Sequence, residues 1–114
     1  MNNKRLGMTF EKRVVNMLME GGYWVHFISP DSRGAQPFDI IAAKDGIAVV
    51  GDCKTSKDHI FRIGRLEENQ KMAFEKWVAC GNTEPVIFVE YKGDVKMISY
   101  CDLKKTGRID LDEI

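Results

Sequence analysis

The fold is set by residues 37–54, which read PFDIIAAKDGIAVVGDCK. Two apolar runs flank Asp45-Gly46, a dipeptide typical of the two-residue turn of a β-hairpin. With that turn, opposed residues carry numbers that sum to 91, so Asp39 faces Asp52. Directly opposed side chains lie on one side of a sheet, with Cβ atoms roughly 4.5–5.5 Å apart. The sequence therefore predicts two neighbouring carboxyl groups at one end of a mostly apolar, buried hairpin.

The end of this hairpin also carries a cation, because strand alternation places Lys54 on the same face as Asp52. Like charges opposite each other destabilise a sheet and raise the pKa of one carboxyl group. One interpretation is a solvated strand end at which Lys54 offsets one charge. The other is a divalent-metal site, since carboxylate oxygens are ligands for hard cations and leave positions for water and a phosphate oxygen.

The flanking sequence predicts an α/β domain with the element order αβββαββ. The first helix is capped by Thr9 and ends at Gly21-Gly22, and the second helix has its apolar stripe at Leu66, Ala73, Phe74, Trp77 and Val78. The last dozen residues mix charges, and they either fray or carry a short final element. The expected strands are residues 23–28, 38–43, 47–54, 85–91 and 95–100, with a loop at 29–37, a polar connection at 55–65 and the second helix at 66–80.

Composition excludes several classes of protein. The 114 residues contain 17 basic and 17 acidic side chains, so any nucleic-acid contact must come from local patches. Three cysteines without a CxxC pair argue against a zinc ribbon or a disulfide scaffold. The sequence has neither a secretory signal nor an apolar stretch long enough to span a bilayer, and it lacks the glycine-rich loops of nucleotide-binding proteins. We expect one cytoplasmic domain over residues 1–114 with no membrane contact and no nucleotide cofactor.

Pro37-Phe38-Asp39, the hairpin and Asp52-Cys53-Lys54 together resemble the signature of the PD-(D/E)XK nucleases. The resemblance covers about residues 8–100 and implies a restriction-endonuclease-like αβββαβ core, with a central mixed sheet flanked by helices. It leaves a charged C-terminal tail at 102–114. The glycine-containing loop before Asp39 and the stretch 54–59 are similar to archaeal-type and phage Holliday junction resolvases. Glu68-Asn69-Gln70, followed by Phe74, is similar to the glutamine motif of RecU-like nucleases.

The resemblance implies roles for six residues. Asp39, Asp52 and the Cys53 carbonyl would hold one or two Mg²⁺ ions, for which Mn²⁺ substitutes, and Glu11 would complete the metal shell. Lys54 would orient the attacking water or stabilise the transition state. The sixth residue, Gln70, would orient Lys54 or a phosphate.

Two of these residues, Glu11 and Gln70, also have a plainer interpretation. Glu11 fits a first helical turn, where a carboxylate complements the macrodipole. Gln70 fits either a solvated helix position or a buried, hydrogen-bonded one. Position 52 carries Asp where many of the similar nucleases carry Glu, and the shorter side chain leaves the number of metal ions open.

Basic side chains gather in two places along the chain. Residues 1–13 carry a net charge of +3 and residues 55–65 a net charge of +2. Surface solvation explains any one of these side chains, but as a group they favour contacts with a phosphate backbone. The candidate DNA-binding residues are Lys12, Arg13, Ser32, Arg33, Lys57, His59, Arg62 and Arg65.

These observations predict a metal-dependent, structure-specific endodeoxyribonuclease that is most similar to Holliday junction resolvases. Two symmetric nicks in one junction require two sites, so a homodimer is expected. A duplex or flap nuclease of the same fold, or a non-catalytic DNA-binding module, is the alternative. By resemblance, the compact form indicates a phage or prophage origin.

Overall fold

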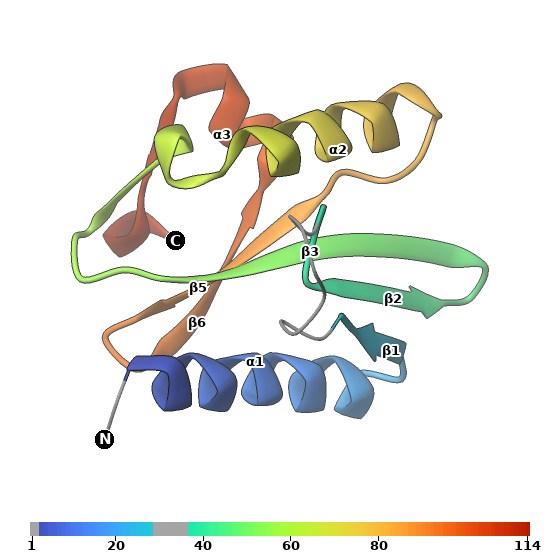
Figure 1. Cartoon of the computed structure of the whole chain (residues 1–114), viewed down its shortest axis with the longest axis horizontal. Helices are drawn as coiled ribbons and strands as arrows, with labels where there is room; N and C mark the ends of the chain where they lie inside the picture. The colour runs from blue at the N-terminus through green and yellow to red at the C-terminus, as the bar shows by residue number, and fades with distance from the viewer. Residues whose placement is uncertain (1–2, 29–36) are drawn as a thin grey trace.

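The computed structural model describes residues 3–28 and 37–114 (Figure 1). No helix in these two ranges is long and apolar enough to cross a membrane. In chain order the elements are α1 (Asn3–Glu20), β1 (Trp24–Phe27), β2 (Ile40–Lys44), β3 (Ile47–Thr55), β4 (Ile60–Arg62), the 3-10 helix η1 (Ile63–Arg65), α2 (Glu68–Ala79), β5 (Val86–Tyr91), β6 (Asp94–Ser99), α3 (Tyr100–Thr106), β7 (Arg108–Asp110) and the 3-10 helix η2 (Leu111–Glu113).

A five-stranded mixed sheet in the order β1-β2-β3-β5-β6 forms the centre of the molecule. All neighbouring strands are antiparallel except β3 and β5, which run parallel and are connected through β4, η1 and α2. Helix α1 covers one face of the sheet, and α2 and α3 cover the other (Figure 1). The predicted α/β class, with a central mixed sheet flanked by helices, is confirmed.

Each face of the sheet has its own apolar core. On the α1 face, the buried cluster comprises Phe10, Val14, Ile40, Ala42 and Phe88. On the other face, it comprises Val50, Phe61, Leu66, Phe74, Ile87, Val89, Tyr91, Ile98, Tyr100, Leu103 and Leu111. A sheet buried on both faces requires strands that are apolar on both faces, as the hairpin sequence indicated.

The hairpin of β2 and β3 has the register that the turn residues predicted. Ile40 pairs with Gly51 and Lys44 with Ile47. Asp45 and Gly46 both adopt positive φ, of 53° and 80°, as the two-residue turn of this type requires. The beginning of β2 therefore lies beside Asp52, the residue that follows Gly51.

Gly51 is required by the close approach of β5. A Cβ atom at this position would lie 2.6 Å from the Phe88 ring and 3.0 Å from the Val86 carbonyl oxygen. A Cβ atom here would have to displace the buried Phe88 ring and would crowd the β5 backbone, so glycine suits the close pairing of β3 with β5. This pairing fixes the strand directly before Asp52.

Three expectations about the flanking elements were wrong. Helix α1 begins at Asn3, so Thr9 lies inside the helix and does not cap it; the good helix formers Lys4, Arg5 and Leu6 extend it upstream. The connection at 55–65 contains β4 and η1. In the apolar stripe of α2, Val78 lies at the exposed end of the helix, 36 % accessible.

The C-terminal segment is folded, which resolves the choice between fraying and a short final element. It forms α3, β7 and η2, and β7 pairs antiparallel with β4 to make a second, two-stranded sheet. Leu103 and Leu111 are fully buried, and Phe61 of β4 lies in the same core. Residues 102–114 are therefore part of the packed structure and not a charged tail.

Replacing Leu111 tests whether this segment stabilises the domain. We expect Leu111→Ala to lower the free energy of unfolding by roughly 2–5 kcal/mol, because it removes buried methyl groups and leaves a cavity. Urea denaturation followed by circular dichroism measures the change. Ile114→Ala is the matched control, since Ile114 is 54 % exposed. Equal stability of the two variants would show that the C-terminal segment adds little to the core.

Candidate active site

Asp52 is the most buried charged side chain in the described part of the chain, with 1 % of its surface exposed. Its Oδ1 accepts a hydrogen bond of 3.0 Å from Nε2 of Gln70. Its Oδ2 makes no hydrogen bond to the residues described and lies 3.2 Å from Nζ of Lys54, an ion-pair distance without the alignment of a hydrogen bond. The pKa of Asp52 is raised to about 8, mainly by burial and then by the Asp39 carboxyl group, although Lys54 acts in the opposite direction.

Asp39 lies directly before β2 and contacts the other strand of the hairpin. Its backbone N–H donates to the Gly51 carbonyl at 2.9 Å, and its Oδ2 accepts a hydrogen bond of 2.9 Å from the backbone N–H of Cys53. Its carboxyl group is also within hydrogen-bonding range of the Asp52 side chain, which contributes to the raised pKa of Asp52. The predicted juxtaposition of the two carboxyl groups is therefore present.

Glu11 reaches the same site from α1. It occupies the middle of the helix, eight residues after Asn3, so complementation of the macrodipole does not explain it. Its pKa is raised to about 6, first by partial burial and second by repulsion from Asp39. Glu11, Lys54 and Arg65 line a cleft of about 220 Å³, together with Phe10, Cys53 and Thr55. Three carboxyl groups and one lysine thus come together from α1, the start of β2 and β3.

Gln70 is buried, so the solvated interpretation of this residue is wrong. Its partner is Asp52, whereas the sequence suggested Lys54 or a phosphate. Its Oε1 accepts a hydrogen bond of 3.0 Å from the backbone N–H of Glu67, the N-cap residue of α2. One side chain therefore caps the helix and holds the Asp52 carboxyl group.

Cys53 contributes its backbone to the site. Its N–H binds Asp39, and its side chain belongs to the α1 face, where burial and the neighbouring carboxylates raise the pKa of the thiol. A thiol with a raised pKa is a poor nucleophile and a poor metal ligand at neutral pH. The role of the Cys53 carbonyl as a metal ligand stays a prediction.

Some of the candidate DNA-binding side chains are bound to other groups of the protein, and others are exposed to solvent. Ser32 and Arg33 lie outside the described residues. Arg13 binds Glu90 at 3.2 Å and the Gly93 carbonyl at 2.9 Å, and thereby joins α1 to the turn between β5 and β6. Arg65 donates to the Thr55 carbonyl at 2.7 Å beside the cleft. Lys12, Lys57 and Arg62 are exposed.

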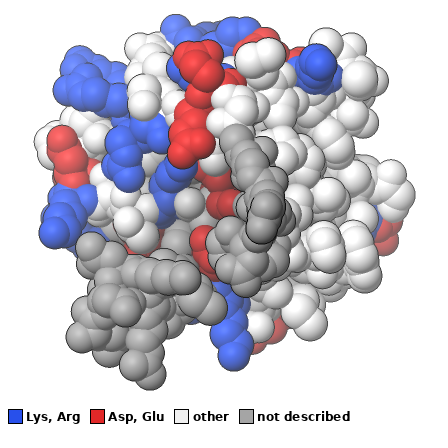
Figure 2. All heavy atoms as spheres, in the orientation of Figure 1, with Lys and Arg blue, Asp and Glu red and all other residues white. Residues whose placement is uncertain are grey.

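Charge is unevenly distributed over the face drawn in Figure 2. Lysine and arginine side chains gather on the left of this view, where Figure 1 places the end of β3 and the beginning of α2. The right side, where the β2–β3 turn lies, is mostly uncharged (Figure 2). The basic region therefore adjoins the end of β3 that carries Asp52 and Lys54.

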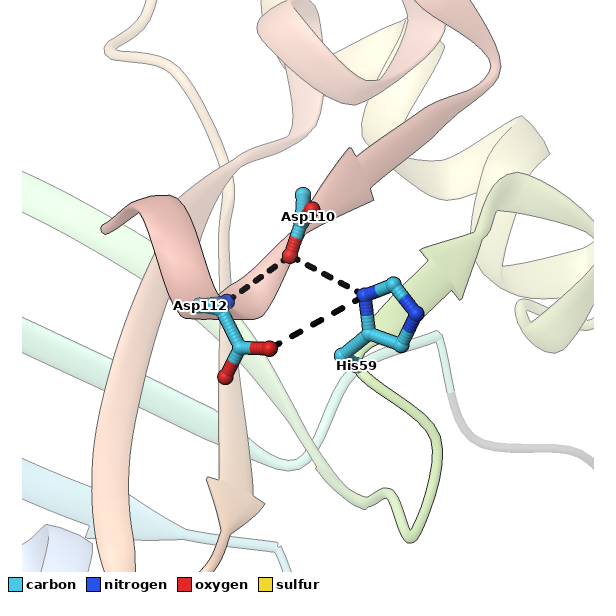
Figure 3. A group of neighbouring side chains, drawn as sticks. All are labelled: His59, Asp110 and Asp112. Atoms are coloured by element: carbon cyan, nitrogen blue, oxygen red, sulfur yellow. Dashed lines mark hydrogen bonds and ion pairs between the residues drawn. The ribbon is translucent and has the colours of Figure 1, made fainter.

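His59 has carboxylate neighbours that the sequence gave no reason to expect. Its Nδ1 lies 3.2 Å from Asp110 Oδ1 and 3.9 Å from Asp112 Oδ2, and the three side chains point toward one another (Figure 3). The potential ligand atoms of this group lie within 4.8 Å of one another, which is compact enough for a metal ion. Asp110 also accepts from the Asp112 N–H, and Asp112 accepts from the Tyr91 hydroxyl, so the group links the loop before β4 to the C-terminal segment. This environment disfavours the predicted contact between His59 and a phosphate.

The comparisons with known proteins agree with this geometry. Residues 2–113 match the family described as "Archaeal holliday junction resolvase (hjc)". Among solved structures, the chain is similar to the Holliday junction resolvase Hjc of Archaeoglobus fulgidus, an archaeal hyperthermophile, with a TM-score of 0.71 and 17 % sequence identity over 93 % of this chain and 89 % of that one. A search of curated protein sequences finds no significant match. The family match, which spans nearly the whole sequence, shows that this chain belongs to the archaeal Holliday junction resolvase (Hjc) family.

Proposed function

We propose that the chain is a divalent-metal-dependent endonuclease that resolves four-way DNA junctions, with Asp39, Asp52, Lys54 and Glu11 as its active site. Membership of the resolvase family supports the substrate class. The observation that carries the proposal is Asp52 Oδ2. This oxygen is buried, makes no hydrogen bond to the described residues, and lies beside a second carboxyl group and a lysine.

The side chains of the site fit a hard divalent cation. Carboxylate oxygens of Asp39, Asp52 and Glu11 are the donors that Mg²⁺ and Mn²⁺ prefer. Asp52 holds its proton up to about pH 8 in the metal-free protein, and a cation between the carboxyl groups would replace that proton. When bound, such an ion lowers the pKa of a coordinated water and stabilises charge on the scissile phosphate.

The protein's own side chains would complete the reaction. Lys54, with 19 % of its side chain exposed, is near enough to solvent to meet a phosphate oxygen, and its charge would stabilise the developing negative charge. Arg65 lines the same cleft and would bind a neighbouring phosphate of the backbone. The exposed side chains of Lys12, Lys57 and Arg62 would add charge along the path of the DNA.

We also infer a homodimer from the reaction. Productive resolution of a four-way junction takes two nicks related by symmetry, and the described part of this chain holds one cluster of this kind, formed by Glu11, Asp39, Asp52 and Lys54. A dimer with two-fold symmetry would place two such sites on one junction.

The first test compares a synthetic four-way junction with a linear duplex of the same sequence in Mg²⁺. We expect paired, symmetric nicks in the junction, loss of detectable cleavage in Asp52→Ala, and a loss of about 10²–10³-fold in Lys54→Ala, because a preorganised charge facing the phosphate is removed. Gel analysis of end-labelled strands measures both rates. Equal cutting of junction and duplex would contradict the resolvase activity and indicate a general nuclease. Binding without cutting would favour a non-catalytic module.

The raised pKa of Asp52 makes a prediction about stability. The folded, metal-free protein keeps this proton up to about pH 8, whereas the unfolded chain loses it near 3.8, so unfolding releases a proton between these values. The free energy of unfolding should therefore fall as the pH rises from 4 to 8, and Glu11 acts in the same direction up to about pH 6. Asp52→Asn has no proton to lose, so at pH 8 we expect it to melt higher than the wild type.

Calorimetry at pH 8 and at pH 4 in the presence of a chelator measures this difference, which should shrink at the lower pH. Asp94→Asn is the matched control, because Asp94 is exposed on β6. A wild type that melts at the same temperature as Asp52→Asn at pH 8 would contradict the raised pKa.

Replacing Arg65 tests the path of the DNA backbone. We expect Arg65→Ala to weaken junction binding in Ca²⁺ and to reduce the slope of log K against log [salt] by about 1, because one phosphate contact is lost. Fluorescence anisotropy over a range of salt concentrations measures the slope. Lys105→Ala on α3 removes the same charge away from the cleft and should leave the slope unchanged. Equal slopes for both variants would remove Arg65 from the interface.

A further inference from the structure

The orientation of the Gln70 side chain is determined by the backbone N–H of Glu67, which can only donate a hydrogen bond. The backbone N–H of Glu67 donates, so it requires the amide oxygen, which accepts at 3.0 Å. The amide nitrogen then faces Asp52 and donates to its Oδ1 at 3.0 Å. With 7 % of its surface exposed, the side chain is also held by packing in the interior of the protein. A neutral amide is the side chain that satisfies an N–H and a carboxylate at once.

Because of this contact, the two carboxyl oxygens of Asp52 have different partners. Oδ1 is occupied by Gln70, whereas Oδ2 has no hydrogen bond among the described residues and lies 3.2 Å from Lys54 Nζ. Rotation of the carboxyl group would break the bond to Gln70 and leave a buried amide unpaired, which is costly. The carboxyl group is therefore fixed with Oδ1 toward α2 and Oδ2 toward Lys54.

We infer that Gln70 is a positioning residue, which makes Asp52 a metal ligand through Oδ2 alone and orients that oxygen before the ion arrives. This inference rests on the proposed function, and it adds that Gln70, a capping residue of α2, also orients a metal ligand of the active site. Groups that orient a metal ligand without touching the ion typically change metal affinity by about 10–100-fold when they are replaced. Because Gln70 is buried and does not line the cleft, its loss should leave junction binding without metal unchanged.

The experiment compares Mn²⁺ affinity in the absence of DNA for the wild type, Gln70→Met and Glu67→Ala. Gln70→Met keeps the length of the side chain but cannot donate to Asp52, and we expect its Mn²⁺ dissociation constant to rise about 10–100-fold. Glu67→Ala removes the carboxylate that caps the same end of α2 but leaves both Gln70 contacts, so it should lose helix stability and bind Mn²⁺ like the wild type. Isothermal titration measures affinity, and thermal melting measures stability.

Two results would overturn the inference. One is wild-type Mn²⁺ affinity in Gln70→Met; the other is an equal loss of affinity in Glu67→Ala, which would reduce Gln70 to a helix cap. If Gln70→Met does not fold, an NMR titration of the wild type with Mg²⁺ tests the inference through the side-chain amide signal of Gln70. We expect Mg²⁺ to shift this amide signal, because the Gln70 amide binds the carboxyl group that would bind the ion. A signal that does not move would also overturn the inference.

The same data separate this inference from the proposed function. A wild type that neither binds Mn²⁺ in an Asp52-dependent way nor cuts a junction would overturn both. A wild type that binds Mn²⁺ and cuts junctions, beside a Gln70→Met variant that does both equally well, would overturn only the role of Gln70.

Discussion

Two carboxyl groups that a sheet brings together away from water cannot both be ionised unless a cation lies near them. In this protein the turn at Asp45-Gly46 fixes the register that brings Asp39 beside Asp52, and burial on both faces of the sheet removes the water. The cost appears as a carboxyl group that keeps its proton up to about pH 8. Lys54 offsets only part of the unfavourable energy of two neighbouring buried carboxyl groups. A site of this kind is suited to hold a divalent ion.

The rest of the structure keeps this cluster rigid and open on one side. Gly51 allows β5 to pair with β3, and this pairing fixes the backbone on which Asp52 lies. Helix α1 brings Glu11 to the cluster on one side of the sheet, and α2 brings Gln70 on the other. Apart from Asp39, which directly precedes β2, each of these groups comes from a packed helix or strand. Such placement favours precise geometry at a reacting phosphate.

The sequence contained enough to predict the hairpin and the cluster, because both follow from local rules. A two-residue turn fixes register, and register determines which side chains are neighbours. The contacts between distant segments could not be predicted in this way. β4 is only three residues long in a polar stretch, and β7 forms with it only because Phe61 and Leu111 share a core. The partner of Gln70 and the carboxylates around His59 likewise depend on tertiary packing, which no periodicity encodes.

The parallel pairing of β3 with β5 also bears on when the enzyme can become active. β3 carries Asp52 and Lys54, but the strand that covers its other edge is encoded more than thirty residues later, beyond α2. A nascent chain that has emerged only through α2 therefore has β3 as an open edge and lacks the segment that orders the backbone around Asp52. Contacts so distant in sequence form late in folding. The proposed active site is thus assembled only in a chain whose C-terminal third has been made.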